Sequence, residues 1–243
     1  MNKMCFSYAV NFNADALQSR LQLEDIMLPS SGFFFSGFTW PVLPVIVGKN
    51  HQFSATEMQW GLVPSWTKDE EQAVELRKLS LNAKGETVAE KPMFRNAFKS
   101  GRCLIPALGF YEWREVNKKK YPYFIQDVKH EFLLFAGISD TWINPASGEE
   151  IHTYSIVTSA ANSLMEMIHN TKKRMPLILG LKDIENWVFG TDNEALNLVK
   201  PCNENMLEAN TISVLASKAN LERNVPEVQE KYKYPELNIQ TLF

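Results

Sequence analysis

The sequence has little cysteine, and this scarcity excludes several classes of protein. Cys5, Cys103 and Cys202 are its three cysteines, too scattered for a disulfide framework or a paired zinc-binding motif. A reducing cytoplasm is therefore the expected compartment, and neither a metal nor another cofactor is expected. The N-terminus lacks a basic segment followed by an apolar run, so no signal peptide is expected. The longest apolar runs, such as Phe132–Ile138, have the length of a strand and are too short to span a bilayer.

Positive charge is also scarce. The sequence has 25 Lys and Arg residues and 28 Asp and Glu residues, which gives a net charge of −3. Domains that bind nucleic acid in general are usually basic, so the overall balance argues mildly against one. The basic residues are nevertheless gathered in two places. These are Lys84, Lys91, Arg95, Lys99, Arg102 and Arg114, and then Lys172, Lys173 and Arg174. These residues either form a local basic face or belong to an ordinary solvated surface.

The pattern of apolar residues predicts one α+β domain over residues 1–243, with 45% hydrophobic and 22% charged residues as in soluble globular proteins. Strands are predicted at Val42–Val47, Thr56–Leu62, Tyr121–Asp127, Phe132–Ile138, Ile151–Thr158 and Thr211–Leu215, and helices at Asn13–Glu24, Asp69–Leu79, Ala160–Ile168, Asp183–Val188 and Asn193–Val199. Pro44 marks the first strand as an edge or bent strand. Strands outnumber helices without regular β-α-β alternation, which favours a bent, mainly antiparallel, barrel-like sheet flanked by helices.

Two residues are candidates for proton transfer. Glu112 lies between Tyr111 and Trp113, and an apolar pocket made by such aromatics would raise its pKa toward neutrality. The alternative is a surface strand with Glu112 facing solvent. His169 comes at a predicted helix end before a basic loop, where it could transfer protons near neutral pH or simply interact with the helix dipole.

Other polar and aromatic residues in the same segments have two interpretations each. Asn82 is either a turn residue or a group that orients a substrate. Trp60 and Trp66 are core residues or, if exposed, platforms for unpaired bases. Cys103 is interpreted as a small core residue and Cys202 as a loop residue without a role.

Several segments are dense in polar and special residues. They are Met4-Cys5, Trp60–Trp66, Asn82–Thr87, Arg102–Trp113, and His169 with Arg174-Met175-Pro176. Taken in order, these segments resemble the SRAP family, the SOS response-associated peptidases that crosslink to abasic DNA. The resemblance spans Met4 to about Pro176. These motifs, in this order and at sensible separations, are together far more specific than any one of them.

The resemblance implies a pseudo-barrel domain with a positively charged groove for single-stranded DNA that carries abasic sites. It implies that Cys5 forms the crosslink and that Asn82, Glu112 and His169 surround it. Lys84, Arg95 and Arg174 would hold phosphates, and Trp66 would contact the DNA. Expected activities are covalent trapping of the abasic site, removal of the residues before Cys5 by the protein itself, and a lyase-like reaction. A monomer that associates with the nucleoid when it acts is expected, because the sequence has neither heptads nor a long amphipathic segment.

Elementary chemistry is consistent with this role for an N-terminal cysteine. Its α-amine, with an ordinary pKa of about 7.7–8.0, can attack an aldehyde to give an imine. The neighbouring thiol then closes a thiazolidine ring. In the sequence, however, Met1-Asn2-Lys3-Met4 precede Cys5, whose nitrogen is then an amide and no nucleophile. Either translation begins at Met4 or these residues are removed.

Three further departures from the family pattern concern binding of the DNA. The usual Cys-Gly-Arg is Cys5-Phe6-Ser7, which lacks one arginine, and Lys84 stands where an arginine is usual. The loop of residues 170–173 is longer than in the commonest form of the motif, so it either adds phosphate contacts or moves His169. Two rival functions are a thiol peptidase acting in trans through Cys5 and His169, and a nucleic-acid-binding module without covalent chemistry.

Overall fold

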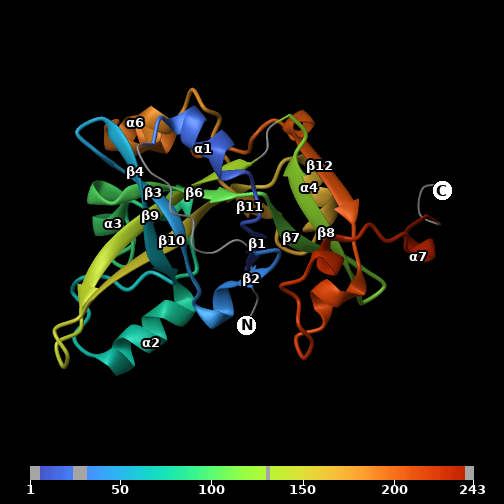
Figure 1. Cartoon of the computed structure of the whole chain (residues 1–243), viewed down its shortest axis with the longest axis horizontal. Helices are drawn as coiled ribbons and strands as arrows, with labels where there is room; N and C mark the ends of the chain where they lie inside the picture. The colour runs from blue at the N-terminus through green and yellow to red at the C-terminus, as the bar shows by residue number, and fades with distance from the viewer. Residues whose placement is uncertain (1–5, 24–31, 130–131, 239–243) are drawn as a thin grey trace.

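The computed structural model describes residues 6–23, 32–129 and 132–238 and contains a closed barrel of five strands (Figure 1). Each barrel strand is hydrogen-bonded to two others, in the cyclic order β10–β4–β3–β6–β9–β10. Their bounds are β3 (Val42–Lys49), β4 (Gln52–Trp60), β6 (Arg102–Ala107), β9 (Leu133–Ile143) and β10 (Glu150–Ala160). All neighbours are antiparallel except β10 and β4, which are parallel.

Two short strands extend the barrel at the C-terminal end of β10. They are β5 (Asn82–Lys84), which runs parallel to β10, and β11 (Arg174–Pro176), which runs antiparallel to it. Thr158 of β10 is opposite Lys84 on one side and opposite Pro176 on the other. The topology therefore brings two of the sequence motifs to the same end of the barrel.

A second sheet is antiparallel and lies beside the barrel, with β7, β8 and β12 on the right of Figure 1. Its order is β12 (Leu207–Thr211), β8 (Lys119–Asp127), β7 (Gly109–Val116), β1 (Ser7–Ala9) and β2 (Phe35–Ser36). The chain passes directly from β6 of the barrel into β7 of the sheet through Leu108, whose amide donates to the carbonyl of Ala9. The buried hydroxyls of Tyr8 and Tyr154, 2.6 Å apart, join β1 to the barrel strand β10. The sheet is thus held in a fixed position against the barrel.

Several of the helices begin where the sequence supplies a polar capping residue. Their bounds are α1 (Ala14–Leu21), α2 (Glu70–Leu79), α3 (Arg95–Ser100), α4 (Ser163–Ile168), α5 (Ile184–Val188), α6 (Asp192–Asn197) and α7 (Pro235–Asn238). The side chains of Asn13, Asp69 and Asn162 accept hydrogen bonds from backbone amides in the first turns of α1, α2 and α4. The helix predicted at Asn13–Glu24 begins as expected but ends at Leu21, because Gln22 takes a left-handed conformation with φ 53°. Glu24 lies outside the described residues.

The predicted α+β class with a mainly antiparallel, barrel-like sheet is confirmed. Two local predictions need correction. For the strand around Pro44 the edge alternative is wrong, because β3 is an interior strand between β4 and β6. It tolerates the proline because β6 pairs only with Ile46 and Val47. The strand predicted at Thr211–Leu215 ends at Thr211, where the chain turns into a 3₁₀ helix at Val214–Ser217 whose first turn is capped by Ser213.

Candidate active site

Glu112 and His169 form a buried pair between the second sheet and the end of α4. Their side chains are 6% and 5% exposed, and Nδ1 of His169 lies 3.7 Å from Oε1 of Glu112. Glu112 is on β7 at the centre of the sheet, and His169 is the residue that ends α4. The solvent-facing alternative for Glu112 is therefore wrong. An acid and an imidazole side by side in a buried position are groups that can transfer protons to and from a substrate.

The aromatic neighbours of Glu112 in the chain do not enclose it. Successive residues of a strand point to opposite faces, so Tyr111 and Trp113 point away from the carboxylate. Tyr111 packs against Phe34 and Phe124 in a separate cluster, with ring centroids 4.7 and 5.0 Å away. The pocket predicted from Tyr111 and Trp113 is wrong, and Glu112 is instead buried on the face toward α4 and His169.

Hydrogen bonds fix the orientation of the His169 ring. Nδ1 donates to the backbone carbonyl of Arg174 at 2.9 Å, since a carbonyl oxygen can only accept. The proton of a neutral ring is thereby assigned to Nδ1, and Nε2 is the nitrogen that can take up or release a proton. His169 is at the helix C-terminus, as the dipole interpretation requires, but its side chain is buried and bonded to β11.

The loop of residues 170–173 holds His169 in place. The carbonyl of His169 accepts from the amides of Lys172 at 3.3 Å and Lys173 at 2.8 Å. Asn170 bonds the backbone of Glu115 on β7 twice, accepting at 3.1 Å and donating at 2.8 Å. The side-chain amide of Asn170 thus imitates a neighbouring strand and fastens the loop to the strand that carries Glu112.

Arg174 is bound by a carboxylate of its own chain. Its guanidinium donates to both oxygens of Glu86, at 2.5 and 2.8 Å, and to the carbonyl of Thr158 at 2.7 Å. The hydrogen bonds from Arg174 hold the pKa of the Glu86 carboxyl below its ordinary value. Glu86 received no role from the sequence, although it belongs to the Asn82–Thr87 motif. The pair joins that motif to β11 and so fixes the relative position of β5 and His169.

The other predicted site residues differ in exposure. Asn82 is half-buried and Lys84 exposed on β5, where they are opposite Ile156 and Thr158 of β10 respectively. Arg95 is exposed at the start of α3, which packs on β6 and β9. Trp66 is 43% exposed, whereas Trp60 is fully buried and donates to the carbonyl of Leu81. The core interpretation therefore holds for Trp60 alone.

Cys5 lies outside the described residues, and the described chain begins at Phe6. The Phe6 carbonyl accepts from the amide of Gly37 at 2.8 Å. In the antiparallel pair of β1 and β7, Tyr8 is opposite Phe110 and Ala9 is opposite Gly109. Moving back along β1 therefore corresponds to moving forward along β7, so the N-terminal end of β1 points toward Glu112.

The two cysteines of the described residues are poor nucleophiles. Cys103 is fully buried, and burial raises the pKa of its thiol to about 12. Burial likewise raises the pKa of Cys202 to about 11. Thiolates are the reactive form, so neither is a candidate for thiol chemistry near neutral pH. The core interpretation of Cys103 is confirmed.

Within the described ranges there is no group of three or more His, Cys, Asp or Glu side chains that could hold a metal ion. None of the helices in these ranges is long and apolar enough to cross a membrane.

Comparisons with known proteins match these motifs and this fold. The model of the family "SOS response associated peptidase (SRAP)" matches residues 4–219. The abasic site processing protein YoqW of Bacillus subtilis is 35% identical over 189 residues, which cover 76% of this chain and 79% of that protein. The abasic site processing protein HMCES of Gallus gallus is 36% identical over 168 residues, covering 60% of this chain and 49% of that protein. A crystal structure of a protein from Bacteroides thetaiotaomicron superposes with a TM-score of 0.86 at 32% identity, covering 94% of this chain and all of the other.

Proposed function

Because the chain belongs to the SOS response-associated peptidase family, we propose that it processes abasic sites in DNA, and that Cys5 traps the aldehyde of such a site in single-stranded DNA. In the acting form Cys5 is the N-terminal residue. The relatives that are named abasic site processing proteins support the general activity. The residue roles below are part of the proposal.

The proposed reaction joins the cysteine and the sugar with loss of one water molecule. The free α-amine of Cys5 attacks C1′ of the ring-opened sugar and gives a carbinolamine. The hydroxyl of the carbinolamine is protonated and leaves as water, which forms the imine. Sγ of Cys5 then adds to the imine carbon, and the thiol proton passes to the ring nitrogen. The thiazolidine so formed keeps the aldehyde from elimination.

The buried pair of Glu112 and His169 is the observation that carries the proposal. The reaction needs one group to take the proton from the attacking amine and to return it to the leaving hydroxyl. Glu112 is given this task, because the N-terminal end of β1 points toward it. His169 exchanges the proton of the sugar oxygen through Nε2, while Nδ1 stays bonded to Arg174. Asn82 orients the sugar, Lys84 and Arg95 hold phosphates as exposed cations, and Trp66 stacks on a base.

Removal of Met1–Met4 is the second part of the proposal. Hydrolysis of the bond between Met4 and Cys5 consumes one water molecule and releases the Met4 carboxylate and the Cys5 amine. The thiol of Cys5 and the carboxyl of Glu112 are the groups assigned to this step. The same residues would therefore first create the nucleophile and then use it.

The test compares two chains that differ only at their start. One begins at Met1, and the other is made so that Cys5 is the first residue, with each N-terminus verified by intact mass. Each is incubated with single-stranded DNA that carries one abasic site, and products are separated under denaturing conditions. We expect a heat-stable protein–DNA band from the Cys5-initiated chain, no band from its Cys5→Ala variant, and a band from the Met1 chain only after residues 1–4 are lost. The proposal is wrong if the verified Cys5-initiated chain forms no band.

A further inference from the structure

A large open groove lies at the tip of the β3–β4 hairpin, where residues from three parts of the chain meet. Its volume is about 910 Å³. The last turn of α1, the hairpin and the segment before α5 supply its walls. The residues used below are Arg20, Lys49, His51, Phe53, Lys182 and Glu185.

The charge of this groove is opposite to that of the whole chain. Arg20, Lys49 and Lys182 line it, and Glu185 is its one carboxylate. The whole sequence has 25 basic against 28 acidic residues. In the part of the chain that the structure describes, none of the three cations forms an ion pair. Three cations that share a concave surface without a carboxylate partner favour an anionic ligand.

Aromatic rings and a rigid turn complete the groove. His51 and Phe53 each pack against Phe189, with ring centroids 4.9 and 5.1 Å apart. Asn50 and His51 have φ values of 51° and 57°, which define a tight hairpin turn of fixed twist. A side chain at Gly48 would collide with Phe189, so the glycine allows this ring to lie against β3. An exposed ring such as His51 next to cations is an arrangement that binds single-stranded nucleic acid.

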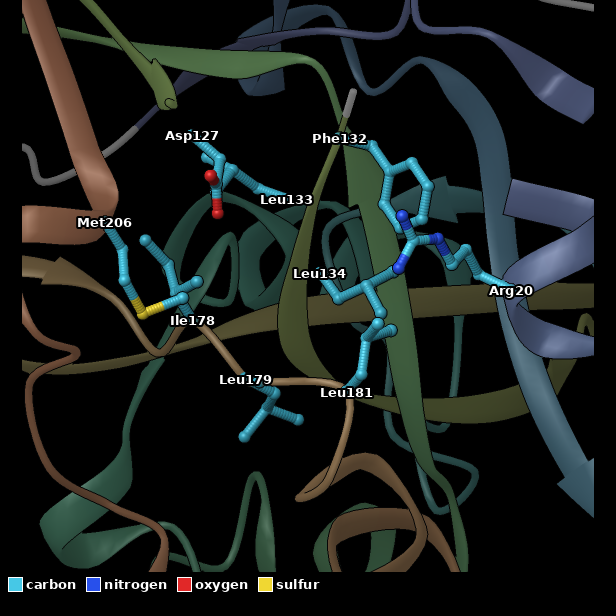
Figure 2. Close-up of a pocket in the computed structure, with 10 residues that line it drawn as sticks. Arg20, Asp127, Phe132, Leu133, Leu134, Ile178, Leu179, Leu181 and Met206 are labelled. Atoms are coloured by element: carbon cyan, nitrogen blue, oxygen red, sulfur yellow. The ribbon is translucent and has the colours of Figure 1, made fainter. Parts of the chain in front are cut away.

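Arg20 lies between the groove and a second, smaller opening. This is a cavity of about 40 Å³ that shares Arg20 and Leu181 with the groove. Figure 2 shows Arg20 reaching toward Phe132 and Leu134 at the edge of that cavity. The cavity has room for only a few water molecules. The groove is the larger of the two openings that Arg20 lines.

The groove and the candidate active site are at opposite ends of β4. The hairpin turn precedes Gln52, whereas Trp60 at the other end is beside Tyr154 of β10 and bonds Leu81 next to β5. Eight steps along a strand at about 3.3 Å each separate the two ends by about 26 Å. A stacked strand of roughly eight nucleotides would span this distance, at about 3.4 Å per nucleotide.

We propose that this groove binds the phosphodiester backbone of a DNA strand whose abasic site is held at the other end of the barrel. The phosphates contact Arg20, Lys49 and Lys182, and the His51 ring stacks on a base. The choice of DNA among phosphate-bearing ligands rests on the proposed function. The groove would give long strands an affinity that short strands lack.

The test uses DNA that cannot react, so that binding is measured apart from crosslinking. Two oligonucleotides are used, of about 6 and about 30 nucleotides, and each carries a tetrahydrofuran analogue of the abasic site. The lengths are chosen so that only the longer strand, when stacked, reaches from the candidate active site to the groove. The variant is Lys49→Glu with Lys182→Glu, and the charge-matched control is Lys200→Glu with Lys233→Glu, two exposed lysines outside the groove. Binding is followed by fluorescence anisotropy over a range of salt concentrations.

We expect the groove variant to bind the long strand roughly tenfold more weakly than the control variant, and to bind the short strand equally well. Its slope of log affinity against log salt should be smaller by about 1.4, the value for two lost contacts to a single strand. Equal long-strand affinity of the two variants would overturn the inference, as would an equal loss on both strand lengths. Inorganic pyrophosphate is the third probe, and loss of pyrophosphate binding without loss of long-strand binding would overturn the assignment to DNA. Undamaged single strands give an independent readout, because the length effect on them persists even if Cys5 forms no crosslink.

Discussion

The two ends of the barrel use their charged residues differently. At the end with β5 and β11, Arg174 is bound to Glu86 and Thr158, and His169 is bound to the Arg174 carbonyl and lies beside Glu112. At the hairpin end, Arg20, Lys49 and Lys182 line a groove and form no ion pair within the described ranges. Charges bonded within the chain fix geometry, and charges without such a partner can bind a ligand. Changes at the first end should therefore lower reaction rates, and changes to exposed groups should lower affinity.

The largest effect is expected for Glu112→Gln. The amide keeps the size of the side chain but cannot transfer a proton, so crosslinking should slow by at least about 100-fold. Binding of DNA with the tetrahydrofuran analogue should stay within about twofold, because the isosteric change leaves the surface that binds DNA intact. The matched control is Glu115→Gln on the same strand. Single-turnover crosslinking by Glu112→Gln at the parent rate would remove Glu112 from the mechanism.

A loss of affinity with an unchanged rate is expected for Trp66→Ala. An exposed tryptophan that stacks on one base contributes about 1–3 kcal/mol, so affinity for single-stranded DNA should fall roughly tenfold or more. The crosslinking rate at saturating DNA should not change, and Trp66→Phe should recover most of the affinity. Leu79→Ala, which removes another exposed apolar side chain, is the control. Equal affinities of the parent and Trp66→Ala in an anisotropy titration would exclude the stacking role.

A smaller change in rate is expected for Asn170→Ala, which loosens the loop after His169. Two hydrogen bonds to Glu115 are lost, so the free energy of unfolding should fall by about 1–2 kcal/mol. The crosslinking rate should fall roughly fivefold, because His169 and Glu112 are held less accurately. Thr171→Ala, the next exposed residue, should leave both quantities unchanged. A lower stability with an unchanged rate in denaturant and crosslinking experiments would mean that the loop does not position His169.

The smallest effect is expected from acid titration of the pair of Glu86 and Arg174. The folded-state pKa of Glu86 is depressed, so the pair stabilises the fold above the unfolded-state pKa of about 4.3 and this contribution is lost as the pH falls through the folded pKa. Glu86 is 47% exposed, so screening limits the contribution to less than about 1 kcal/mol. The free energy of unfolding in urea is measured from pH 7 to pH 3. It should fall less over this range for Glu86→Gln than for the parent, because the variant has no carboxylate to lose at this position. Glu90→Gln, which removes another exposed carboxylate, should show the same fall as the parent, and parallel pH curves for parent and Glu86→Gln would contradict the prediction.

Much of the fold could be predicted because its signals are local. Capping residues such as Asn13 and Asp69 mark helix starts, and the apolar run at Phe132–Ile138 marks β9. The closure of the barrel is different, since it depends on β10 pairing with β4, which is far from it in sequence, as is β5, the strand that extends the barrel beside β10. The edge alternative for the strand around Pro44 fails because it, too, depends on long-range pairing. Its local pattern is that of an edge strand, but the register of β6 leaves room for it inside the barrel.

The sequence by itself determined the family, since the motifs that contain Asn82, Glu112 and His169, the residues proposed to carry the chemistry, can be read along the chain. Only the tertiary structure decided how these residues are used. Arg174 is bound to Glu86, 88 positions away, and Glu112 is buried toward His169 instead of between its aromatic neighbours. The physical reason is that burial and ion pairing depend on which side chains the strand registers bring within a few ångströms. A linear sequence lists such groups but does not state the distances between them.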